Sequence, residues 1–230
     1  MRGASAVAAI TGALLVVEDD EGIFRVARNR ATLWAGRDLH PGLGDLEGLA
    51  VDETCTNVWA LSEEDGAVIS LPLRGKPTRA TVIGHLPRPG KRKNKGFEGL
   101  AYMPPRFSPS RRAALVAVHE GKPRRVGIFA LPELELTHNF KLPDEFKDLL
   151  DDLADVTVDP VTGALLLLSD QSRRIAVARI VEGTLVLSGS YDLPIGKGQK
   201  PEGMDFASSS RLLVVLDDSA KLLEIAVHRD

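Results

Sequence analysis

The chain is built of short apolar runs separated by turn residues. Residues 165–168 are four consecutive leucines, whereas residues 221–225 (Lys-Leu-Leu-Glu-Ile) alternate approximately between polar and apolar positions. Continuous apolar runs are typical of strands buried on both faces, and alternation is typical of strands with one exposed face. Because Gly, Pro, Asp and Thr interrupt these runs every few residues, and helical periodicity is nearly absent, the pattern predicts an all-β fold.

One motif recurs along the chain. Glu-Gly-Leu at 47–49 and 98–100 and Glu-Gly-Met at 202–204 each precede, after a turn, an apolar strand that ends in an acidic residue. Weaker copies begin near residues 3 and 154, so the five starts (near 3, 47, 98, 154 and 202) lie about 44–56 residues apart. This is the period of a propeller blade. We therefore predict a single β-propeller domain over residues 1–230, with five blades of about four antiparallel strands.

Two segments depart from the repeat. The last copy ends at Asp230 without room for a fourth strand. Either the final blade has three strands, or the N-terminal segment supplies a closing strand. Residues 143–153 form an extra segment before the fourth copy, and its start has the spacing of a short amphipathic helix. We expect this insertion on one rim of the propeller.

Composition and charge narrow the functional classes. The chain is 43% hydrophobic and 27% charged, as ordinary globular proteins are, and its net charge of −3 gives no electrostatic reason to bind nucleic acid. The single cysteine, Cys55, excludes an internal disulfide. The Ala-rich start resembles a signal peptide but also fits the first repeat, and no apolar run is long enough to span a membrane. We expect a cytoplasmic monomer as the chain stands, or a periplasmic or secreted protein if a leader has been removed.

Acidic residues recur where the repeats would bring them together. In a propeller the first strand of each blade lines the central channel, which would place Glu47, Glu98 and Glu202 there, with Asp155 one position out of register. The second strands would end near one mouth of that channel, in Glu18, Glu63, Glu120, Asp170 and Asp217. Carboxylates crowded into a small volume raise one another's pKa unless positive charge compensates.

Several arrangements would stabilise such a cluster. A hard cation such as Ca²⁺ takes oxygen ligands and needs no contiguous motif. A cationic substrate or a sugar would also match the carboxylates. Internal ion pairs are a third solution, with Lys95, Lys122, Arg173 and Lys200 as the nearest cations in the sequence.

For a single glutamate the simpler interpretation is structural. Each would accept hydrogen bonds from amides of the next blade, and the glycine that follows allows close backbone approach. For the cluster as a whole we favour a bound cation, with Glu47, Glu98, Asp155 and Glu202 as the predicted ligands.

Two further features carry chemistry. His119 precedes Glu120, and this pair is the candidate for general acid/base work, although a histidine in such a place is more often structural. Residues 88–95 (Arg-Pro-Gly-Lys-Arg-Lys-Asn-Lys) form a basic run that would contact an anionic partner or remain a solvated loop between blades.

Several segments occur in a family-like order. They are Asp-Leu-Glu-Gly-Leu-Ala at 45–50, Asn-Lys-Gly-Phe-Glu-Gly-Leu-Ala-Tyr at 94–102, Asp-Leu-Ala-Asp-Val at 152–156, the leucine run with Ser-Asp-Gln-Ser-Arg-Arg at 165–174, and Lys-Pro-Glu-Gly-Met at 200–204. Over most of residues 40–230 the chain therefore resembles the SdiA-regulated (YjiK-like) family of bacterial propellers. The resemblance implies an often exported propeller of no settled activity, and likeness to sister propellers with lactonase or phytase-like activity implies calcium in the channel. Ala154 departs from the glutamate of three other repeats, so a carboxylate ring would be incomplete.

Three functional hypotheses follow. The first is a binding or scaffold propeller with a cation such as Ca²⁺ in its acidic channel, and with a small-molecule or protein partner. The second is a metal-dependent hydrolase of a phosphoester or lactone, with His119 or Glu120 near the metal. The third is a protein-interaction module that uses the rim loops, including 88–95 and 143–153.

Overall fold

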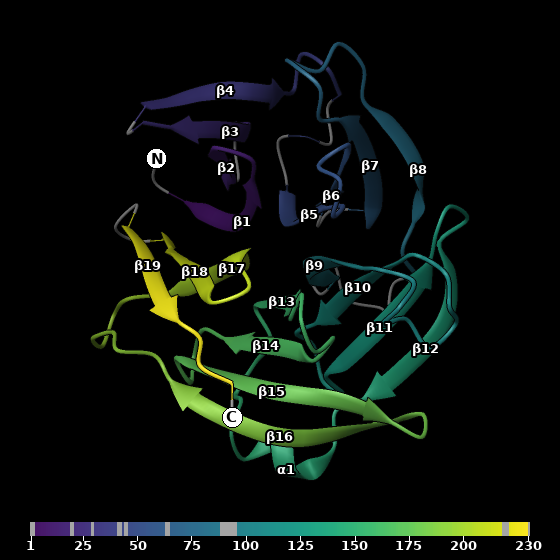
Figure 1. Cartoon of the computed structure of the whole chain (residues 1–230), viewed down its shortest axis with the longest axis vertical. Coiled ribbons are helices and arrows are strands. Elements are labelled where there is room, and N and C mark those ends of the chain that lie inside the picture. The colour runs from purple at the N-terminus through teal and green to yellow at the C-terminus, as the bar shows by residue number, and fades with distance from the viewer. Residues whose placement is uncertain are drawn as a thin grey trace.

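The computed structural model describes residues 3–18, 21–28, 30–40, 43, 46–62, 65–87, 96–217 and 221–229. These residues form five antiparallel sheets arranged around a central axis, as Figure 1 shows. Four sheets have four strands and one has three. The predicted five-bladed β-propeller is confirmed.

Within each blade the strands pair in chain order, and the first strand lies nearest the axis (Figure 1). Blade 1 comprises β1 (Ala4–Ile10), β2 (Ala13–Glu18), β3 (Gly22–Ala27) and β4 (Arg30–Gly36). Blade 2 comprises β5 (Leu46–Val51), β6 (Asn57–Ser62), β7 (Ala67–Pro72) and β8 (Thr81–His85). Blade 3 comprises β9 (Phe97–Met103), β10 (Ala114–His119), β11 (Arg125–Ala130) and β12 (Glu135–Lys141). Blade 4 comprises β13 (Asp155–Val158), β14 (Leu165–Ser169), β15 (Arg174–Val181) and β16 (Thr184–Asp192). Blade 5 comprises β17 (Pro201–Ser208), β18 (Arg211–Leu216) and β19 (Lys221–Ala226).

The ring closes without a strand exchanged between its two ends. In the described residues blade 5 has three strands, and β1 pairs with β2 of its own blade. Of the two alternatives for the last repeat, the three-stranded blade is therefore the one observed. The first strands contact one another around the axis, including β17 of the last blade with β1 of the first.

The apolar core lies mainly between neighbouring blades. The second strands are its most buried parts: all residues of β14 are buried, as the leucine run predicts. Five separate clusters of buried side chains occur in the described part of the chain. The smallest consists of Ala4, Val7, Val16 and Val215 and joins blade 5 to blade 1. This closing interface therefore has the least apolar packing.

The insertion before blade 4 contains the expected helical turn, α1 (Asp144–Lys147). Phe146, Leu150 and Leu153 are fully buried between blades 3 and 4, so the insertion is part of the core. The guanidinium of Arg124 donates to the carbonyl oxygens of Leu150, at 2.6 Å, and of Asp151. No helix in the described ranges is long and apolar enough to cross a membrane.

Candidate functional site

A β-bulge directs the repeated glutamate toward one mouth of the channel. In blade 2, Leu46 pairs with Ser62 and Gly48 pairs with Leu61, so Glu47 is an extra residue on its strand. Such a bulge re-aims a side chain and locally disrupts pairing. Glu98 and Glu202 lie in the corresponding register shifts of β9 and β17. The motif is thus a structural device repeated around the axis.

Blade 1 carries the same bulge with a serine in it. Ala4 pairs with Glu18 and Ala6 pairs with Val17, which leaves Ser5 as the extra residue. The Ser5 hydroxyl donates to the Leu46 carbonyl oxygen of blade 2 at 2.9 Å. Sequence reasoning did not single out Ser5, because its segment is Ala-rich and lacks the glutamate that marks the other repeats.

These residues line a cavity of about 310 Å³. Seven carboxylates from four of the blades and the insertion contribute to its wall: Glu47, Glu98, Glu120, Asp152, Asp170, Glu202 and Asp217. Ser5 and Gln171 are the other side chains with polar oxygens among the described lining residues. The oxygen-rich wall lies at the start of the first strands and at the end of the second strands.

One further member of this group lies outside the repeated Glu-Gly-Leu motif. Asp152 belongs to the insertion, is only 6% exposed, and accepts hydrogen bonds from the Ser169 hydroxyl and the Gln171 amide. Its place in the cavity depends on these tertiary contacts, and Arg124 holds the preceding carbonyls. In the sequence, Asp152 is marked only as the first residue of the Asp-Leu-Ala-Asp-Val segment at 152–156, with no chemical role.

The crowding changes the chemistry of Glu202. Burial, and then the charges of Asp170 and Asp217, raise the pKa of this carboxyl to about 7, although Lys200 acts in the opposite direction. A carboxyl with this pKa holds its proton for part of the time at neutral pH. A positive charge in the cavity would favour its ionised form.

Asp155 does not belong to this cavity, contrary to the sequence-based grouping. Ala154 takes the place of the bulged glutamate, and Asp155 takes the place of the glycine that follows it elsewhere. Its carboxylate is 3% exposed and accepts a 2.6 Å hydrogen bond from the Met204 amide of blade 5. Burial raises its pKa well above the usual range. Asp155 therefore links two blades, which is the structural role considered for the glutamates.

The glycines of the motif allow the first strands to approach closely. A Cβ built on Gly48 would lie 2.7 Å from the Leu100 Cβ, and one on Gly99 would lie 2.5 Å from the Asp155 Cα. Real side chains do not tolerate such distances, so the repeated Gly is required by packing between blades.

Of the other predicted acidic residues, some line the first cavity and others do not. Glu120, Asp170 and Asp217 line the cavity. Glu18 ends β2 and is absent from the cavity lining. Glu63 and the basic run 88–95 lie outside the described residues.

His119 and Glu120 point in different directions, as successive residues at the end of a strand do. Glu120 lines the cavity, whereas His119 is 3% exposed and lies edge-on to Phe97, with 6.0 Å between ring centroids. A Cβ on Gly121 would come within 2.6 Å of the imidazole. The structure therefore does not bring the predicted acid/base pair together at the cavity.

The fold occurs in proteins of different function. The chain is similar to Myxococcus xanthus glutaminyl cyclase, with a TM-score of 0.64 and 14% identity over 97% of this chain and 89% of the other. It is also similar to a chain of a nidogen/laminin complex, with a TM-score of 0.61 and 13% identity over 98% of this chain and 76% of the other. A third similar structure is a structural genomics protein of unknown function from Bacteroides thetaiotaomicron, with a TM-score of 0.61 and 11% identity over 98% of this chain and 69% of the other. Identities this low show the fold alone. No curated protein sequence matches the chain. The family model described as SdiA-regulated matches residues 84–217, which is more than half of this chain.

Proposed function

The chain belongs to the SdiA-regulated family, and we propose that it is a binding propeller whose acidic channel mouth takes a hard divalent cation, Ca²⁺ in the first place. The observation that carries this proposal is the convergence of seven carboxylates on one cavity of about 310 Å³. A divalent ion offsets the mutual repulsion of such groups.

The donor chemistry of the cavity fits a hard cation. Its described lining offers carboxylate, hydroxyl and amide oxygens and no imidazole or thiol. Oxygen donors suit Ca²⁺, Mg²⁺ or Mn²⁺, whereas Zn²⁺ and Cu²⁺ prefer nitrogen and sulfur. The bulged Glu47, Glu98 and Glu202 would hold the ion, with Asp170 and Asp217 beside them. Asp155 is excluded from this set by its contact with Met204.

The side chains that would coordinate the ion are not already grouped around one point. Within the described ranges no three His, Cys, Asp or Glu side chains are grouped closely enough to form a metal centre. The carboxylates would therefore move inward or bind through water. Ca²⁺ tolerates both, because its coordination is flexible and commonly includes water, whereas Mg²⁺ demands near-ideal octahedral geometry.

A thermal melt after chelator treatment, with each ion added back separately, tests the proposal. At an ion concentration of about 100 times Kd, binding to the folded state contributes about 2.7 kcal/mol, which is about 5–10 °C in Tm for a chain of this size. We expect the largest shift with Ca²⁺ and a greatly reduced shift in the double variant Glu98→Gln/Glu202→Gln. The control is Asp205→Asn, which changes an acidic residue of the first strands that does not line this cavity.

An unchanged Tm with all three ions would overturn the proposal and assign the glutamates to contacts within the protein. A Ca²⁺ shift that survives the double variant would also overturn it, because the ion would then bind elsewhere.

A further inference from the structure

A second cavity, of about 250 Å³, lies at the opposite end of the first strands. The first cavity is lined by the beginnings of these strands, at Glu47 or Glu98, and the second by their later residues, such as Val51, Tyr102 and Phe206. From this second mouth we infer a binding site for a small organic amine, that is, an ammonium group on a compact apolar or aromatic body. This site is independent of the proposed cation site.

The charge partner for the amine is Asp205. Its two carboxylate oxygens accept hydrogen bonds from the Ala9 amide, at 2.8 Å, and from the Thr157 hydroxyl, at 3.1 Å. Both donors are neutral, and no Lys, Arg or His in the described part of the chain forms an ion pair with Asp205. The Phe206 amide also hydrogen-bonds this carboxylate. A carboxylate has about four lone-pair positions, so one remains for a further donor. Asp205 is therefore fixed in orientation and still able to accept from an ammonium group.

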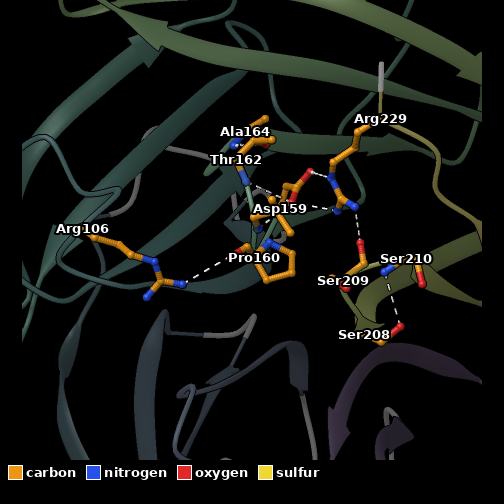
Figure 2. A network of polar contacts seen from close by, with 10 residues as sticks. Arg106, Asp159, Pro160, Thr162, Ala164, Ser208, Ser209, Ser210 and Arg229 are labelled. Atoms are coloured by element: carbon orange, nitrogen blue, oxygen red, sulfur yellow. Dashed lines mark hydrogen bonds and ion pairs between the residues drawn. The ribbon is translucent and has the colours of Figure 1, made fainter.

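Two acidic residues near the rim, Glu53 and Asp159, are each paired with an arginine. Arg106 pairs with Glu53 and also donates to the Pro160 carbonyl oxygen at 3.4 Å, so it bridges blades 2, 3 and 4. Arg229 binds both carboxylate oxygens of Asp159 at 2.9 Å. Figure 2 shows Arg106 and Arg229 on either side of the loop that contains Pro160. The two arginines compensate rim charges and fix the rim, whereas the inner carboxylate of Asp205 has no such cation.

The rest of the cavity wall suits an apolar body. Leu49, Leu100, Met204 and Phe206 contribute to the lining, together with Tyr102. The Tyr102 ring is stacked on Trp59, with 5.6 Å between centroids and 2° between planes. A ring held in this way offers a rigid surface to a ligand, and aromatic faces attract cations. Thr157, Ser208 and Ser209 add polar groups to the lining, so the wall is about equally polar and apolar. In small-molecule sites such placed polar groups fix the orientation of the ligand.

The ionisation of Asp205 is compatible with this role. Burial raises the pKa of its carboxyl to about 6, although the Ala9 and Phe206 amides and the Thr157 hydroxyl act in the opposite direction. At pH 7.5 the carboxylate is therefore mainly ionised, as is an aliphatic ammonium group.

The test is a titration at pH 7.5 with benzylamine and with its neutral analogue benzyl alcohol, followed by calorimetry and saturation-transfer NMR. We expect benzylamine to bind at least tenfold more tightly than benzyl alcohol. Asp205→Asn should lower its affinity tenfold or more, because it removes the charge and keeps the shape of the side chain. The asparagine Oδ1 still accepts from the Ala9 amide, while its Nδ2 donates to the Thr157 hydroxyl. Glu202→Gln, at the other mouth, should leave the affinity unchanged.

Tyr102→Leu gives an independent reading if Asp205→Asn proves unstable, and it should weaken binding several-fold. Equal binding of benzyl alcohol, an unchanged affinity in Asp205→Asn or Tyr102→Leu, or the absence of benzylamine binding would each overturn the inference. Loss of binding in Glu202→Gln alone would assign the amine to the first cavity, which overturns this inference and leaves the proposed cation site standing.

Discussion

The carboxylate of Asp205 accepts a 2.8 Å hydrogen bond from the backbone amide of Ala9, across 196 positions of the sequence. This contact joins the last blade to the first, where no shared strand closes the ring. The apolar cluster at the same interface is the smallest of the five in the described residues. Ring closure therefore relies more on polar and backbone contacts between β1 and β17 than on apolar burial.

The closest of these contacts predicts the effect of Gly203→Ala. A Cβ at position 203 would lie 2.7 Å from the Ala6 Cα and 3.0 Å from the Ser5 carbonyl oxygen. Backbone atoms cannot move aside as a flexible side chain can, so the two blades must separate. We expect a loss of about 2–4 kcal/mol in the free energy of unfolding, measured by urea denaturation.

Gly189→Ala is the matched control, because Gly189 also lies in a strand, β16, and a Cβ there would meet nothing closer than 3.9 Å. Its stability should stay within about 0.5 kcal/mol of the wild type. Equal effects of the two substitutions would show that the approach of Gly203 to blade 1 does not limit stability.

The sequence predicts the blades because each repeat buries the same kind of surface. Glu47, Glu98 and Glu202 could be identified from their motif, and the bulges bring them to one cavity. Ser5 could not, because the bulge that defines its position is a property of pairing and leaves no mark on an Ala-rich segment.

Two further residues show where sequence reasoning ends. The motif spacing groups Asp155 with the glutamates, but in the folded repeat Asp155 takes the place of the glycine, and its carboxylate accepts a hydrogen bond from the Met204 amide of the next blade. Asp152 enters the first cavity through hydrogen bonds to Ser169 and Gln171, which only the folded insertion brings together. The repeat does not predict the second cavity. Tyr102 and Asp205 follow the Glu-Gly dipeptide in two copies of the repeat, but nothing in the sequence shows that they line one cavity in the folded ring.

Arg229→Ala should destabilise the protein through Asp159, whose side chain is only 8% exposed. Burial alone would raise the pKa of Asp159, but the Arg229 guanidinium and the Val161 and Thr162 amides outweigh it and hold the pKa below its usual range. Without the guanidinium, a largely buried carboxylate loses its cation. We expect a loss of about 1–3 kcal/mol at pH 7.

The pH dependence checks the cause of that loss. A carboxyl with a depressed pKa in the folded state contributes stability that is present above its unfolded pKa and lost as the pH falls through its folded value. The difference between wild type and Arg229→Ala should therefore shrink below about pH 4. Arg174→Ala is the control, because its partner Asp192 is 74% exposed and such pairs contribute about 0–1 kcal/mol. A difference that does not change with pH would exclude the ion pair as its source.

Phe146→Ala should show that the insertion is part of the core. Phe146 is fully buried between blades 3 and 4, and its removal leaves a cavity, so we expect a loss of about 3–5 kcal/mol in a urea titration. Leu136→Ala on β12 is the control, because Leu136 is 40% exposed, and its loss should be below about 1 kcal/mol. Similar small effects for both would mean that the insertion is only loosely attached.

In chelator-treated protein, Glu202→Gln should be more stable than the wild type at pH 8 and similar to it at pH 4.5. The pKa of Glu202 is raised to about 7 by burial and by Asp170 and Asp217, so the folded state binds its proton more tightly than the unfolded state does. Stability therefore falls as the pH rises from about 4.5 to about 7, and it changes no further above that range.

Glutamine stays neutral over the whole pH range. At pH 8 the free energy of unfolding of the variant should therefore exceed that of the wild type by about 1–3 kcal/mol, and we call this difference the gap. Asp192→Asn, on the exposed edge of β16, should produce no such gap, which separates the effect of crowding from a general change in net charge. If Ca²⁺ binds as proposed, its addition should remove or reverse the advantage of the variant, because the ion stabilises the ionised glutamate that glutamine cannot replace. A gap of equal size at pH 4.5 and pH 8 would contradict the raised pKa, and would trace the gain to packing instead.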